Sequence, residues 1–178
     1  EESPGKKNNE GKNFGGADKI DASTDLFDHF YKNRKTKVEQ EEFVRARLFD
    51  ILIGDWSKHE DNWKWAAYER ADGFRLYRPI PRDRDHAFSR QDGAINWLAD
   101  RPFGVQNIEN FGYKFTGIKS LTFQAQHMDR FLMQEAPKSV FMEQAKYIQE
   151  HISEADIERA VANMPAEIYE KSGKEIAA

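Results

Sequence analysis

The stretch from Gly54 to Phe88, GDWSKHEDNWKWAAYERADGFRLYRPIPRDRDHAF, decides the fold that we predict for this chain. Alternating aromatic and polar residues flank Asp72-Gly73, a dipeptide typical of tight β-hairpin turns. A two-residue turn there pairs Glu69 with Leu76 and Asn62 with Asp83, and cross-strand partners share one side of the ribbon. Prolines in the second strand leave this register open by about one residue. The hairpin, over about 62–80, therefore brings together the polar clusters at its two ends.

Composition limits the class of protein. The chain has 178 residues, enough for a single domain with a real core. A net charge of −4 indicates neither a nucleic-acid partner nor a membrane surface, and no apolar run is long enough for direct membrane insertion. The absence of cysteine excludes thiolate metal sites and disulfides. Because the chain begins with Glu1 and shows no closing cap, we expect a fragment of a longer protein.

The hydrophobic pattern predicts an α+β fold that is mainly helical, with one prominent hairpin. We expect a flexible segment over 1–22 and a single domain over 23–178. The strongest helix spans about Val38 to Trp56, is apolar on nearly all sides in its second half, and should end at a left-handed Gly54. Further expected elements are a helix over 25–31, a basic linker over 32–37, a short helix within 93–100, an irregular loop over 101–119, helices over 121–135, 138–152 and 154–163, and a last turn over 167–171.

The residues at the two ends of the hairpin suggest a site for a hard cation. Asn62, Asp83 and Asp85 offer the oxygen ligands that Mg²⁺ or Mn²⁺ prefers. Phosphoryl transfer uses such a set, together with a carboxylate that orients the acceptor hydroxyl. Candidates for that catalytic carboxylate are Asp55, Glu60 and Asp61. The competing interpretation is a solvated salt-bridge ladder, since arginines at positions 82, 84 and 90 alternate with the two aspartates.

Two short motifs resemble an atypical kinase-like superfamily, which includes HipA, the spore-coat CotH kinases and the secretory-pathway kinases. Lys58-His59-Glu60-Asp61-Asn62 resembles the tail of its Asp-Arg-His-x-x-Asn catalytic loop. Residues 83–88, DRDHAF, are similar to its Asp-x-Asp-x-x-Phe metal motif. The resemblance implies a kinase C-lobe-like domain in which Asn62 and Asp85 bind metal and ATP is the nucleotide. Residues 45–56, RARLFDILIGDW, look like a kinase-like region of large bacterial cell-envelope proteins, which implies a periplasmic or envelope location.

The chain departs from this superfamily in two places. Ser57 occupies the position of the catalytic aspartate, and a serine cannot take the role of that carboxylate. The first 37 residues show neither a glycine-rich loop nor a strand lysine, so the rest of the parent chain would have to supply the missing lobe. We expect His59 to buttress the loop rather than bind a ligand. Three functions remain open: a phosphotransferase part that is inactive alone, a pseudokinase-like binding or scaffolding module, and a metal-dependent phosphoester hydrolase.

Overall fold

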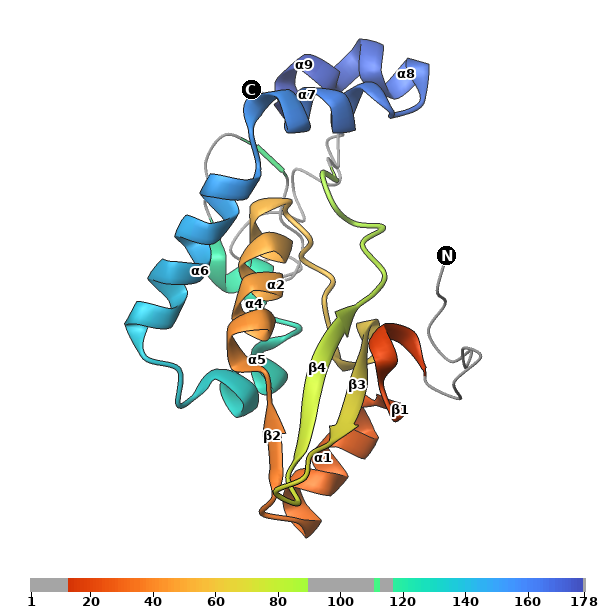
Figure 1. Cartoon of the computed structure of the whole chain (residues 1–178). Coiled ribbons are helices and arrows are strands. Elements are labelled where there is room, and N and C mark those ends of the chain that lie inside the picture. The colour runs from red at the N-terminus through yellow and green to blue at the C-terminus, as the bar shows by residue number, and fades with distance from the viewer. Residues whose placement is uncertain (1–12, 90–110, 113–116, 178) are drawn as a thin grey trace.

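A four-stranded sheet with helices on one side forms the centre of the molecule (Figure 1). The computed structural model describes residues 13–89, 111–112 and 117–177. Its sheet has the order β1-β3-β4-β2, with β1 and β3 antiparallel, β3 and β4 antiparallel, and β2 and β4 parallel. The predicted class, α+β and mainly helical, is confirmed. The helix expected within 93–100 and most of the loop expected over 101–119 lie outside the described residues.

The predicted hairpin is present as β3 (Trp63–Glu69) and β4 (Arg75–Pro81), but its register is shifted by one residue. Glu69 pairs with Arg75 instead of Leu76. The cause is a longer turn: the Arg70 amide donates to the carbonyl of Phe74, and Gly73 donates to the carbonyl of Arg70. Gly73 has φ 77°, which is the left-handed conformation that a three-residue hairpin loop requires.

Two short edge strands were not predicted. β1 (Lys19–Ala22) pairs with β3, and β2 (Thr36–Val38) lies in the segment expected to be a basic linker. The expectation of a flexible segment through residue 22 is therefore wrong for residues 13–22, where a short 3₁₀ turn (Phe14–Gly16) precedes β1. Strands of three or four residues have too few positions to show an alternating pattern, so their pairing partners specify them.

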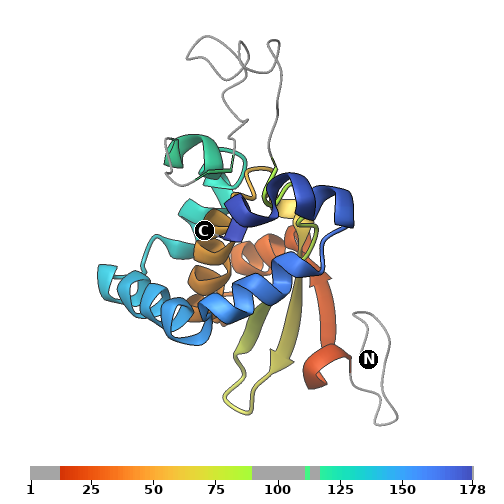
Figure 2. The ribbon, with the colours of Figure 1, turned by 90° about the horizontal axis from the view of Figure 1, so that it is seen from above.

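Three helices cover the apolar face of the sheet. They are α1 (Ser23–Lys32), α2 (Gln40–Leu52) and α5 (Gln126–Met133), and Figure 2 shows the helices from above. Each contributes a buried side chain to one core around Trp63 and Trp65: Leu26, Phe43 and Met128. The two tryptophans fall on the same face of β3, as the alternation predicted, and this burial orients the hairpin against the helices.

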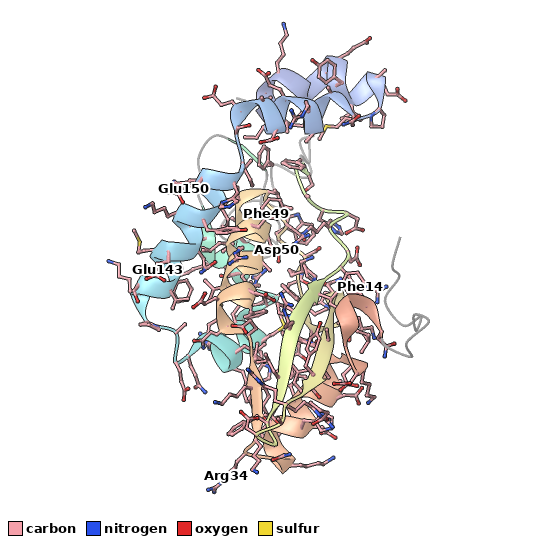
Figure 3. The ribbon with its side chains drawn as sticks, viewed as in Figure 1. Phe14, Arg34, Phe49, Asp50, Glu143 and Glu150 are labelled. Atoms are coloured by element: carbon pink, nitrogen blue, oxygen red, sulfur yellow. The ribbon has the colours of Figure 1, made fainter. Side chains whose placement is uncertain are left out.

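Helix α2 is central, as predicted, but its buried face is partly charged. It is shorter than expected, and its second half is not apolar on all sides: Arg47 and Asp50 are buried, whereas Leu52 is 44% exposed. Figure 3 labels Asp50 beside Phe49 in this part of the helix. Gly54 follows with φ 69°, which confirms the predicted left-handed residue.

The remaining helices follow in order after the hairpin. The helix expected over 121–135 is two helices, α4 (Ile118–Thr122) and α5, because a turn over 123–125 lets each bury its own apolar residue. Ser153 caps α7 through its bond with the amide of Asp156, as predicted. Helix α6 packs along α2, with Glu143 and Glu150 on its exposed side (Figure 3). The elements are α6 (Lys138–His151), α7 (Glu154–Ala162), α8 (Ala166–Ile168), a π-helical turn (Tyr169–Gly173) and α9 (Lys174–Ala177).

Within the described ranges, no helix combines the length and the apolar character needed to cross a membrane.

Candidate functional site

The loop between α2 and β3 begins at the buried end of the helix. After the left-handed Gly54, the amide of Asp55 donates to the carbonyl of Asp50 at 2.8 Å. A Cβ at position 54 would lie 3.0 Å from the ring of Phe111, so a side chain has little room there. The loop is thus anchored where it leaves the core, which is a favourable place for functional side chains.

His59 and Asn62 brace the short 3₁₀ helix Glu60–Asn62 that leads into β3. The His59 amide donates to Asn62 Oδ1 at 2.9 Å, and His59 Nδ1 accepts from the amide of Asp61 at 3.3 Å. The structural role predicted for His59 is therefore confirmed. Glu60 faces away from this turn, with its carboxylate 2.8 Å from Nδ1 of His127 on α5.

Asn62 and Asp83 are in contact, although the shifted register does not pair them directly. The backbone carbonyl of Asn62 accepts from the amide of Arg82 at 2.8 Å, and Asn62 Nδ2 donates to Asp83 Oδ2 at 3.0 Å. Asp83 has φ 54°. A non-glycine residue in that region costs about 1 kcal/mol or more, so the surrounding bonds must hold it. The two clusters therefore meet, as predicted, through one backbone bond and one side-chain bond.

Asp85 lies next to this contact and is 67% exposed at its side chain. Its Oδ1 is 2.7 Å from Nδ1 of His86, whose ring packs edge-on against Trp56. Slight burial raises the pKa of Asp85, but the bonds with His86 and the interaction with the side chain of Asp83 outweigh it, so the pKa is lowered.

The two catalytic candidates occupy opposite environments. Asp55 is buried, and its Oδ2 forms an ion pair with Lys58 Nζ at 3.0 Å while Oδ1 accepts from the hydroxyl of Ser57 at 3.2 Å. Asp61 is 90% exposed at its side chain and faces only His59 among its ion pairs in the described structure. The charge of Asp55 is therefore already compensated by Lys58. Asp61, in contrast, is exposed and has only the contact with His59 among its ion pairs in the described structure.

Lys58 is a buried residue to which the sequence assigned no role of its own. It is fully buried, and besides Asp55 its ammonium group donates to the carbonyl oxygens of Arg82 at 2.6 Å and Asp83 at 2.7 Å. Lysine is almost never fully buried unless it is paired. The sequence around Lys58 therefore gives no sign of burial, because two of its partners lie more than 20 residues away.

A charged cluster beneath the loop connects it to the helices. Asp50 accepts from Arg47 at 3.1 Å and from Arg84 at 2.9 Å, and Arg47 also binds Asp129 on α5. Burial raises the pKa of Asp50, and the cations of Lys58, Arg47 and Arg84 oppose this shift. Arg84 thus bonds to a buried acid of α2, and its bonding to Asp50 does not match the surface ladder considered as the alternative.

The donor set fits a hard cation in part. Asp83 and Asp85 supply adjacent carboxylates, which suit Mg²⁺ or Mn²⁺. The amide of Asn62 presents its nitrogen to Asp83, and its oxygen is occupied by His59, so Asn62 orients an acid in this arrangement. Among the described residues, no group of three or more histidine, cysteine, aspartate or glutamate side chains is placed to hold a metal ion.

Comparison of the chain with protein-family models, with curated proteins and with solved structures found no match.

Proposed function

We propose that this chain is the C-lobe-like part of a metal- and nucleotide-dependent, kinase-like phosphotransferase domain. In this proposal Asp83 and Asp85 bind Mg²⁺ or Mn²⁺, and Asn62 holds Asp83 toward the ion. The observation that carries the proposal is the bond from Asn62 to Asp83, which joins the two motifs at one end of the hairpin. The order of a central helix, a loop, a hairpin and an acidic turn also agrees with the resemblance.

The metal would neutralise phosphate charge and the two carboxylates during phosphoryl transfer. The described residues contribute positioning: Lys58 and Asn62 fix Asp83, while His86 holds Asp85. ATP as the nucleotide, a missing lobe supplied by the rest of the parent chain, and a cell-envelope location all belong to this proposal through the same resemblance.

Cation binding can be tested by thermal unfolding of the 178-residue chain in Mg²⁺ or Mn²⁺, with and without ATP. A cation that binds only the folded chain adds about 3 kcal/mol at a hundredfold excess over its dissociation constant, so the melting temperature should rise. Asp85→Ala should abolish the rise. Asp28→Ala, which removes an exposed acid on α1, is the control and should leave it intact. No shift in the unaltered chain at millimolar cation contradicts the proposal.

A pseudokinase-like binding module is the second candidate, and Asp55 favours it. Ser57 has no carboxylate to offer an acceptor hydroxyl. The carboxylate of Asp55 is occupied, since it accepts from the Ser57 hydroxyl and is paired with Lys58. A module of this kind would bind Mn²⁺ and ATP without transferring phosphate. The parent chain, with its missing lobe, is needed to separate the two functions. When it is incubated with labelled ATP and a mixture of protein and peptide acceptors, transfer that Asp85→Ala abolishes supports the phosphotransferase, and binding without transfer supports the module.

A further inference from the structure

We infer that Lys58 is a positioning residue for the proposed cation site, an internal cation that holds the backbone of Asp83. The inference rests on the proposed function for its cation arm only. Lys58 has no exposed surface, and its ammonium group has three oxygen partners: Asp55 Oδ2 and the carbonyls of Arg82 and Asp83. The two carbonyls accept hydrogen bonds from the ammonium group, whereas the Asp55 carboxylate is an ion-pair partner whose Oδ2 accepts no hydrogen bond in the described structure.

The two carbonyls belong to the residues directly after β4, where the chain turns into the acidic motif. Asp83 has a left-handed backbone there, which an L residue adopts only when its surroundings hold it. The amide of Arg82 donates to the carbonyl of Asn62, and the carbonyl of Arg82 accepts from the ammonium group. The backbone at Arg82 is therefore held on both sides. Without Lys58, both carbonyls would lose their buried donor.

Asp55, the ion-pair partner of Lys58, is itself anchored to α2. Its amide is bonded to the carbonyl of Asp50, inside the cluster of Arg47, Arg84 and Asp129. Lys58 therefore transmits the position of the central helix to Asp83. The Asn62 side chain then acts on a carboxylate whose backbone is already placed. Since Lys58 is fully buried, it does not itself contact a substrate.

The test replaces Lys58 with methionine, which keeps the length of the side chain and removes its donors. Mn²⁺ affinity, measured by calorimetry, should fall about 10- to 100-fold, the range for residues that support metal ligands. Lys58→Arg, which restores several donors, should recover most of the affinity. Lys146→Met removes an exposed lysine of α6 and should change nothing. If Lys58→Met does not fold, Asp55→Asn with Lys58→Met removes both buried charges, and the same loss of affinity is expected.

A second readout needs no cation. In the cation-free chain, NMR should show slowly exchanging side-chain amide protons of Asn62, because Nδ2 donates to Asp83, and Lys58→Met or the double variant should abolish that protection. Unchanged Asn62 signals overturn the role of Lys58 whatever the metal result, as does wild-type Mn²⁺ affinity in Lys58→Met. If the unaltered chain binds no Mn²⁺, the proposed function fails, and the Asn62 signals alone decide whether Lys58 positions Asp83.

Discussion

Buried charges join the loop of the candidate site to the central helix and to α5. Asp50 lies at the centre of this arrangement, bonded to Arg47 within α2 and to Arg84 in the acidic turn. A buried ion pair contributes little net stability compared with apolar residues of the same shape, but removing one partner leaves an uncompensated charge. The identity of Asp50 should therefore matter more for stability than that of any exposed acid.

Asp50→Asn is expected to lower the free energy of unfolding by about 1 to 3 kcal/mol, because Arg84 loses its carboxylate partner while the buried Arg47 keeps Asp129. Urea denaturation followed by tryptophan fluorescence measures the change, since Trp63 and Trp65 are buried in the core. Asp28→Asn, in an exposed pair on α1, serves as the control and should leave the urea midpoint nearly unchanged. Equal effects of the two substitutions would contradict this account of Asp50.

Tyr77 makes stability depend on alkaline pH. Burial raises the pKa of its phenol above the ordinary 10.0; the bond with Arg75 opposes this shift, and the bond with Asp21 adds to it. The folded chain thus keeps the proton more tightly than the unfolded chain. This contribution to stability is complete below about pH 10 and is lost as the pH rises further. Urea midpoints from pH 9 to 11 should fall steeply, and less so in Tyr77→Phe. Tyr31→Phe, at a 75% exposed position, should retain the full dependence.

At the level of elements, the hairpin turn sets which residues meet at the open end. The loop from Ala71 to Gly73 contains one residue more than a two-residue turn, and this shifts every pair along β3 and β4. Asn62 consequently lies opposite Arg82 in the backbone and reaches Asp83 with its side chain. A turn some distance from the candidate site therefore determines how that site is assembled.

Gly73→Ala should destabilise the chain by about 1 to 2 kcal/mol, the cost of a left-handed conformation for an L residue. The φ of 77° causes this cost, because a Cβ there would meet only the mobile end of Lys35 at 3.2 Å. Gly112→Ala is the matched control: no atom of the described residues lies within 4 Å of its Cβ position, and its φ is outside the left-handed range. Thermal unfolding of both variants measures the difference. A neutral Gly73→Ala would show that the turn tolerates another conformation.

At the level of the whole molecule, the helices divide into two groups by what they pack against. Helices α1, α2 and α5 bury side chains against the sheet, and α6 packs on α2. Helices α7 to α9 pack mainly on one another within the described residues, and Figure 1 shows them beyond the end of the sheet. In the part of the chain that the structure describes, few buried apolar contacts therefore link this last group to the core.

Amide hydrogen exchange should reflect this division. Local opening follows the amount of buried apolar contact, so amides of α7 to α9 should exchange much faster than those of β3 and α2. Mass spectrometry of peptic peptides after exchange gives the comparison within one sample, with the β3 peptide as the internal reference. Equal protection of α7 and β3 would indicate that the last helices unfold only together with the sheet.

The local pattern of residues was sufficient for the elements with strong periodicity. The hairpin, the central helix with its left-handed Gly54, the loop-buttressing role of His59, the cap at Ser153 and the meeting of Asn62 with Asp83 could all be predicted, because each depends on neighbours along the chain or across one turn. The metal, the nucleotide and the kinase-like activity remain proposals based on resemblance and on this contact.

Long-range packing determined the rest. The edge strands β1 and β2 exist because β3 and β4 offer them hydrogen-bonding partners. The register of the hairpin depends on the length of its loop, and the left-handed Gly73 is compatible with a two-residue turn as well as with the three-residue loop that forms. Lys58 and Asp50 look like surface residues in the sequence. Each is buried with a partner from beyond β4: the carbonyls of Arg82 and Asp83 accept from Lys58, and Arg84 donates to Asp50. These partners come close only once the chain has folded.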